Sequence, residues 1–139
     1  MSVKENKELV RRLIQEYNNQ RNPKVVEEIL APDYVGHQAP GKTYTRDRIR
    51  DFFEKVVPES FPDLEDTILQ LFGEGDLVVA RMRRSLTFTG SWGNIPSTNK
   101  SGSFEMCSIF RIADGKIVEQ WLVLDSVTEF KLLGIYGKS

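Results

Sequence analysis

The sequence predicts an α+β domain: a cone-shaped, curved antiparallel sheet packed with three N-terminal helices and enclosing an apolar pocket. Apolar residues follow a helical spacing before Pro58, and they alternate with polar residues along much of the chain after Pro62. Helices followed by a run of strands, rather than alternating with strands, are typical of the α+β class. A length of 139 residues suits one domain, which we place at 1–139.

The three predicted helices are marked by their caps and by proline. The first begins at the N-cap Ser2, where a glutamate three residues later completes a capping box. The second begins at Asn22, which precedes a proline in the first turn, and ends before Pro32. The third spans 45–57 and is expected to stop at Pro58, because proline disfavours a helical conformation in the residue before it.

The rest of the chain is predicted to be an extended segment, four strands and a short final helix. They cover 33–38, 63–72, 77–89, 103–112, 116–126 and 128–133. Asp114-Gly115 joins the last two strands as a hairpin. Apolar and polar residues alternate along 77–89 except at Arg84. We group Arg84 with Arg81 and Arg83 on an exposed face of the sheet or at a dimer interface.

Composition excludes several classes of protein. A formal net charge of -1 gives no electrostatic footprint for binding nucleic acid or an anionic membrane. No apolar run approaches the length of a membrane span, and the polar N-terminus lacks the apolar core of a signal peptide. One Cys and one His make a structural zinc site implausible. We therefore expect a cytoplasmic protein without a structural zinc site.

The segment from Gly36 to Thr43 reads GHQAPGKT and matches the phosphate-binding loop pattern. Such a loop follows a buried parallel strand and opens a helix. Here Pro40-Gly41 indicates a plain turn, and no crossover helix is visible between Pro62 and Ser126 to connect parallel strands. Nucleotide binding is kept as a remote alternative.

The stretch 110–121, FRIADGKIVEQW, with Asp125 after it, resembles the signature hairpin of the SnoaL-like polyketide cyclases. These cyclases share the fold of nuclear transport factor two with the ketosteroid isomerases. The segments 35–37 (VGH), 61–63 (FPD) and 75–81 (GDLVVAR) extend the resemblance over nearly the whole chain. The chain departs from the pattern at Phe88, where members often carry a histidine.

The resemblance implies a cyclase or isomerase that works without a cofactor, with Asp125 as general acid and base next to a substrate carbonyl. A carboxylate in an apolar cavity has a raised pKa, which suits proton transfer near neutral pH. On the predicted strand, Trp121 and Asp125 share a face. His37 would bind the substrate or exchange a proton with Asp125. The alternatives are that Asp125 caps the final helix and that His37 lies at the pocket rim.

The predicted ligand is an apolar or polycyclic small molecule. Side chains that could line its site are Trp121, Tyr17, Phe53, Trp92 and Met106, although the last four suit core packing better. The resemblance also implies a homodimer. The alternative function is a non-catalytic module for small-molecule binding or dimerisation on the same fold, which the missing loop histidine favours.

Overall fold

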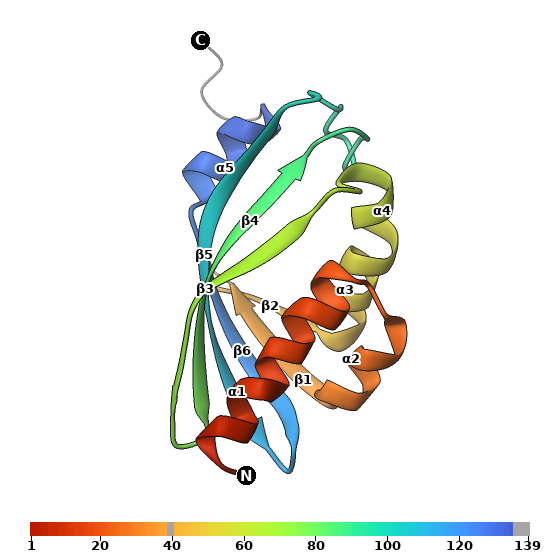
Figure 1. Ribbon diagram of the computed structural model, residues 1–139. Helices are drawn as coiled ribbons and strands as arrows, with labels where there is room; N and C mark the ends of the chain where they lie inside the picture. Colours follow the sequence, from red (N-terminus) through yellow and green to blue (C-terminus); the bar gives the residue numbers. More distant parts are fainter. Residues whose placement is uncertain (39–40, 135–139) are drawn as a thin grey trace.

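The computed structural model describes residues 1–38 and 41–134, and it shows helices packed on one face of a curved six-stranded sheet (Figure 1). The helical segments are α1 (Val3–Arg12), η1 (Leu13–Asn19), α2 (Pro23–Ile29), α3 (Arg46–Asp51), η2 (Phe52–Val56), α4 (Val57–Ser60) and α5 (Ser126–Leu133). The strands are β1 (Leu30–Gln38), β2 (Lys42–Thr45), β3 (Glu65–Glu74), β4 (Leu77–Thr87), β5 (Ser101–Ala113) and β6 (Lys116–Leu124). The predicted α+β class with three N-terminal helical units is confirmed.

The caps predicted for the N-terminal helices are present. The Ser2 hydroxyl accepts the N–H of Glu5, and the Glu5 carboxylate accepts the N–H of Ser2, which completes the capping box of α1. α1 runs directly into η1, a π-helical segment. Asn22 caps α2 by accepting the N–H of Lys24. α2 ends where β1 begins, so Pro32 lies in the strand.

Pro58 does not end the third helical unit, and the predicted stop there is wrong. α3 begins at its cap Thr45 and passes through the π-helical η2 into α4, which reaches Ser60. Pro58 lies in the first turn of α4. A proline at that position lacks only an N–H that the start of an α-helix leaves unpaired. The change from π to α geometry therefore lets the helical path continue through proline.

The sheet order is β2-β1-β6-β5-β4-β3, and β1 with β6 is its one parallel pair of neighbours among the strands that the structure describes. β1 and β2 form an antiparallel hairpin in which His37 pairs with Thr43 and Gln38 with Lys42. The phosphate-loop pattern therefore lies in a hairpin and opens no helix, which contradicts the nucleotide-binding alternative. Residues 39 and 40, and with them half of the predicted Pro40-Gly41 turn, lie outside the described residues.

Alternation along the strands divides the sheet into an inner face under the helices and an outer face. The inner positions of β4 and β5 that are buried are Val78, Ala80, Met82, Leu86, Phe104, Met106, Ser108, Phe110 and Ile112. Arg84 occupies the same inner row of β4, so the predicted exposed cluster is correct only for Arg81 and Arg83. Strand period two explains the difference, because Arg84 is two residues from Met82 and from Leu86.

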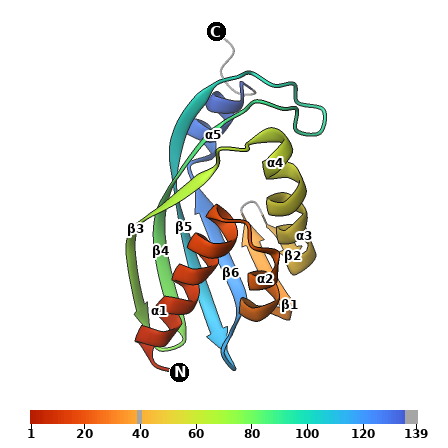
Figure 2. The ribbon, with the colours of Figure 1, turned by 45° about the vertical axis from the view of Figure 1, so that its right-hand side comes forward.

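Figure 2 shows α1 to α4 across the inner face and α5 at the end of the sheet away from the N-terminus. Buried side chains from these helices, including Val10, Ile14, Tyr17 and Val26, meet the inner face of the sheet in one hydrophobic cluster. No helix among the described residues is long and apolar enough to cross a membrane.

Candidate active site

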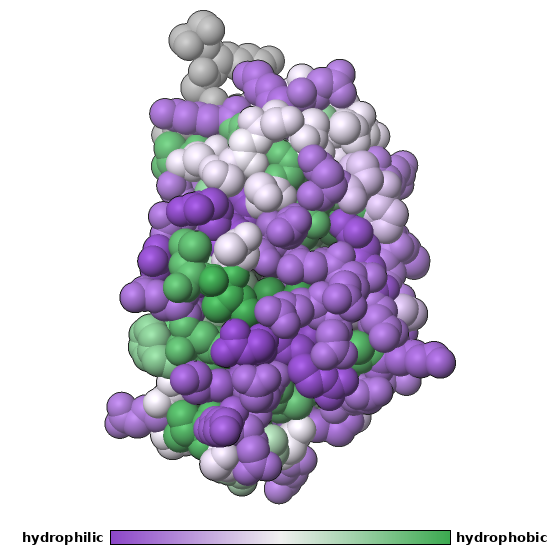
Figure 3. Space-filling model, viewed as in Figure 1, coloured by the Kyte–Doolittle hydropathy of each residue, from purple (hydrophilic) through white to green (hydrophobic). Residues whose placement is uncertain are grey.

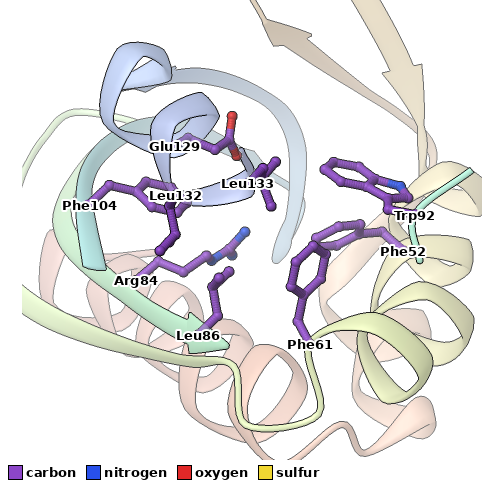
Figure 4. Close-up of a pocket in the computed structure, with 9 residues that line it drawn as sticks. All are labelled: Phe52, Phe61, Arg84, Leu86, Trp92, Phe104, Glu129, Leu132 and Leu133. Carbon is purple, nitrogen blue, oxygen red and sulfur yellow. The ribbon is translucent and has the colours of Figure 1, made fainter. Parts of the chain in front are cut away.

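A cavity lies between the inner face of β4 and β5, the segments η2 and α4, the loop after β4, and α5 (Figure 4). Its lining residues are Phe52, Phe61, Arg84, Leu86, Trp92, Phe104, Glu129, Leu132 and Leu133. Its volume is about 20 Å³. Such a space holds a water molecule and is well below the roughly 300–1,000 Å³ of small-molecule sites. A larger ligand requires lining side chains, such as Trp92 or Leu132, to move.

Arg84, one of the residues that line the cavity, belongs to a buried ion pair. The Nε and Nη2 atoms of Arg84 donate to the two carboxylate oxygens of Asp66 at 2.7 and 2.8 Å. The Arg84 side chain is 12% exposed and the Asp66 side chain is fully buried. Burial works against the charge of Arg84, but the attraction and hydrogen bonds of Asp66, together with the smaller effects of Glu129 and Tyr44, leave the pKa of Arg84 raised.

Asp66 is held in place from the opposite side by η1. The Nδ2 atom of Asn18 donates to a carboxylate oxygen of Asp66 at 3.0 Å. The side chain of Asn19 bonds both the N–H and the C=O of Asp66. Arg84 also lies against aromatic rings, with Cζ 5.8 Å from the ring centre of Phe52 and 5.6 Å from that of Phe53. The guanidinium is therefore fixed in one position.

Glu129 faces Arg84 across the cavity from α5 (Figure 4). Glu129 shares a side of α5 with Leu132 and Leu133, because residues three and four apart lie on one helical face. Burial raises the pKa of Glu129, and the charge of Arg84 opposes that rise only in part. The carboxylate has no hydrogen bond or ion pair to any other described residue. A carboxyl with these properties suits general acid and base chemistry.

Asp125 does not line this cavity. Its side chain is exposed and caps α5, accepting the N–H of Thr128 at 3.1 Å and the Thr128 hydroxyl at 2.6 Å. The Thr128 hydroxyl and N–H lower the pKa of Asp125. The expected rise in pKa is therefore wrong, because hydrogen bonds to the charged form outweigh desolvation here.

His37 and Trp121 lie on the outer face of the sheet, away from the cavity. They are paired across β1 and β6, and their rings stack with centres 5.4 Å apart. The Nε2 atom of His37 lies 2.7 Å from a carboxylate oxygen of Glu119, which also pairs with Arg111. These bonds lower the pKa of Glu119, with His37 contributing most. The structure therefore does not bring His37 to a cavity beside a catalytic carboxylate.

Among the other predicted ligand contacts, Trp92 alone lines the cavity. Tyr17 is fully buried, packs edge-on against Phe53 and donates its hydroxyl to Glu54 at 2.7 Å. Phe53 and Met106 are buried in the core. The packing interpretation of these three residues fits the structure.

Arg84, Asp66 and Glu129 were missed by the sequence interpretation, and two of them left a signal. Arg84 is a charged residue in an inward row of apolar residues, which predicts a buried charge with a partner. Glu129 precedes Leu132 and Leu133 by helical spacing. Asp66 left no such signal, because its pairing with Arg84 depends on the register between β3 and β4. No group of three His, Cys, Asp or Glu side chains within 1–38 and 41–134 is arranged to hold a metal.

The chain is therefore a small α+β domain in which helices cover one face of a curved sheet and a carboxyl group lies in a mostly apolar cavity between them. The family model of the SnoaL-like polyketide cyclases matches residues 8–132, and the chain belongs to that family. The resemblance of the terminal hairpin is thereby confirmed. A search of curated proteins finds no match.

Solved structures with the same fold cover nearly the whole chain. AclR from Streptomyces galilaeus, a candidate hydroxylase, is 23% identical with a TM-score of 0.84, over 98% of this chain and 100% of AclR. IdmH from Streptomyces antibioticus, a candidate polyketide cyclase, is 27% identical with a TM-score of 0.79, and the match covers 93% of this chain and 98% of IdmH. An LEH-like epoxide hydrolase from M. tuberculosis is 17% identical with a TM-score of 0.75, and the match covers 94% of this chain and 90% of the hydrolase. The fold thus hosts several chemistries.

Proposed function

We propose that this protein is a cyclase- or isomerase-type enzyme that moves a proton next to a carbonyl of an apolar small molecule, with Glu129 as the general acid and base. The observation that carries the proposal is a carboxyl with a raised pKa in an apolar cavity. Family membership and the similarity to IdmH support the reaction class. A base whose pKa approaches the working pH transfers protons efficiently.

The reaction begins when the Glu129 carboxylate removes a proton from the carbon beside the carbonyl. The electron pair of that C–H bond moves toward the carbonyl oxygen, and Glu129 becomes neutral. The neutral form suits an apolar environment, because its solvation cost is lower than that of the carboxylate. Returning the proton to another atom of the substrate completes an isomerisation. In an aldol-type ring closure, the carbanion attacks a second carbonyl, and the alkoxide that forms takes the proton back from Glu129.

The test is hydrogen exchange at the carbon beside the carbonyl of 2-tetralone in D₂O, followed by NMR. Glu129→Gln should lower catalysed exchange by about 10²- to 10⁴-fold, the usual contribution of a positioned acid or base. Asp125→Asn is the matched control, because it also replaces a carboxylate by an amide, at the cap of the same helix and outside the cavity. If Asp125→Asn or His37→Asn abolishes exchange and Glu129→Gln does not, the catalytic residues are Asp125 and His37, as the sequence predicts, and not Glu129.

The alternative is a non-catalytic association module, and two observations favour it. The cavity is small, and the outer face exposes hydrophobic side chains of Val35, Phe72, Leu77, Ile109 and Val123. Figure 3 shows hydrophobic surface gathered over the strands, on the left, and a largely hydrophilic surface over the helices. Exposed apolar patches of this kind mark interaction sites.

We further propose that a second copy of the chain covers this outer face in a homodimer. Val123, which is 66% exposed, lies among the strands that would meet. Val123→Lys should convert a dimer to a monomer in sedimentation or light-scattering measurements, because it places a charge in the contact. A wild-type monomer over micromolar concentrations contradicts the homodimer.

A further inference from the structure

We infer that a hollow at the end of the sheet opposite α5 is a second binding site, and that it takes an organic ammonium ion such as a linear diamine. The hollow lies between the start of α1 and the turns that join β3 to β4 and β5 to β6, and Figures 1 and 2 show these three segments together near the N-terminus. It shares no lining residue with the cavity around Glu129. The inference therefore goes beyond the proposed function and does not depend on it.

The hollow is large enough for a small organic molecule. Its volume is about 440 Å³, against about 20 Å³ for the cavity around Glu129. Small-molecule sites usually have roughly 300–1,000 Å³. The two turns are held side by side, because the N–H of Ile112 in β5 donates to the C=O of Asp76 at 2.8 Å. The apolar residues of the lining are Met1, Ile112 and Ala113.

Asn6 of α1 carries the polar atom that calls for a ligand. The residue lines the hollow and is 3% exposed. Its Nδ2 atom donates to the C=O of Gly75 at 3.5 Å, which fixes the orientation of the amide, because the reverse orientation would set Oδ1 against a carbonyl oxygen. Oδ1 then has no hydrogen-bond partner among the described residues. A buried acceptor without a donor lowers stability, so a ligand that brings an N–H group to Oδ1 is bound more tightly.

The charges around the hollow favour a cation. Asp76 and Asp114 line it from the two turns, and neither carboxylate has a hydrogen bond or ion pair to another described residue. Lys116, two residues after Asp114, is directed elsewhere and donates to the C=O of Glu27 at 2.7 Å. The start of α1 carries a partial positive charge, which the Glu5 carboxylate of the capping box offsets. The side-chain groups left for a ligand are therefore acceptors, and two of them are charged.

These features select an organic ammonium ion over a metal ion. An ammonium group has N–H donors that match Oδ1 of Asn6, and an alkyl chain would lie along Met1 and Ile112. In a linear diamine, the second ammonium group would reach the carboxylates of Asp76 and Asp114. A metal ion such as Ca²⁺ needs about six to eight oxygen ligands around one point. No three acidic side chains in the part of the chain that the structure describes are arranged in that way.

The test is a titration of ¹⁵N-labelled protein with 1,4-diaminobutane, followed through the amide signals in NMR at about 0.15 M salt, where screening weakens non-specific attraction. Saturable shifts should gather at residues 75–76 and 112–115 and at the side-chain amide of Asn6. The diol 1,4-butanediol has the same chain without charge, and it should cause no such shifts. The inference is overturned by shifts that map to the cavity around Glu129, by equal binding of the diol, or by the lack of saturable binding at millimolar diamine.

Variants locate the site. Asn6→Leu removes the unpaired acceptor at similar size, and it should weaken binding of the diamine by about tenfold or more, the usual effect of losing a hydrogen bond to a charged group. The double variant Asp76→Asn with Asp114→Asn should weaken binding by about 2- to 30-fold, since each exposed charge pair contributes modestly. Glu74→Gln is the matched control, because it removes a carboxylate from an exposed residue next to Gly75 that does not line the hollow.

The double variant also covers the case in which Asn6→Leu fails to fold. Asp76 and Asp114 are exposed turn residues, and asparagine tolerates the φ of 52° at Asp114. Unchanged affinity in the double variant, or an equal loss of affinity in Glu74→Gln, contradicts the site. If Ca²⁺ causes the same shifts at a lower concentration than the diamine, the hollow binds a metal ion and the inference is overturned.

Discussion

The inner and outer faces of the sheet treat charge in opposite ways. On the inner face, the Arg84–Asp66 pair is 12% and 0% exposed. On the outer face, His37 and Glu119 are 35% and 23% exposed and face the surface with Arg111. One residue along a strand separates the two environments, since side chains alternate between the faces. The environment of a charged residue in this sheet therefore depends on which face its side chain points to as much as on the residue type.

The same contrast divides the two carboxylates of α5. Asp125 is solvated and bonded to Thr128, and its pKa is lowered. Glu129, one helical turn later, faces the cavity, and its pKa is raised. A carboxylate that accepts hydrogen bonds is stabilised in its charged form, and a desolvated one is stabilised in its neutral form. The position of Asp125 after the family's hairpin motif therefore does not identify the carboxyl group whose pKa is raised, which is that of Glu129.

The largest expected difference between the faces is in stability. Arg84→Met should reduce the free energy of unfolding by about 3–5 kcal/mol, because it leaves Asp66 as a buried charge without its partner. Arg83→Met, one residue away on the outer face, should change it by less than about 0.5 kcal/mol. Urea denaturation of both variants measures the two free energies of unfolding. Equal losses would contradict the difference between the inner and outer faces.

A smaller effect of opposite sign is expected at Glu129. Because the folded state raises the pKa of Glu129, it keeps a proton that the unfolded state loses as pH rises from about 4.3. The free energy of unfolding therefore falls as the pH rises from the unfolded-state pKa to the folded-state pKa of Glu129, and it stays lower at higher pH. Glu129→Gln lacks this loss, so its melting temperature should exceed that of the wild type at pH 8 and match it near pH 4. A lower melting temperature at pH 8 contradicts the raised pKa.

Asp125→Asn should shift stability in the other direction. The folded state lowers the pKa of Asp125, so its charge stabilises the fold above the unfolded-state pKa, and that stabilisation is lost as pH falls through the folded-state pKa. Asparagine still caps a helix but carries no charge. We expect a slightly lower melting temperature than the wild type at pH 7 and no difference at pH 2. Identical melting curves at pH 7 would remove the contrast with Glu129.

The smallest effect is expected in the pair of the outer face. Glu119→Gln removes the charge that faces His37 and Arg111, and it should change the free energy of unfolding by less than about 1 kcal/mol, as partly exposed pairs usually do. Chemical denaturation in low and high salt measures it. A loss comparable to that of Arg84→Met would mean that the outer face is covered, as a dimer would cover it.

Much of the fold was predictable because its signals are local. The caps Ser2 and Asn22 and the Asp114-Gly115 turn depend on residues within a few positions of each other. Pro58 misled the prediction because the helix changes from π to α geometry just before it. Of the two tryptophans predicted to contact a ligand, Trp92 lines the cavity, whereas Trp121 lies on the outer face, one residue from the inward Leu122.

By itself the sequence determined most of the order of helices and strands, the β5–β6 hairpin and the alternation that gives the sheet two faces, but it did not predict β2 or its pairing with β1. Tertiary structure alone decided which charges became a site. Asp66 meets Arg84 because β3 and β4 pair in that register, and Glu129 reaches the cavity because α5 packs against the inner face near Leu132 and Leu133. The physical reason is that a pKa depends on burial and on charges across space, which neighbouring residues in a sequence do not specify.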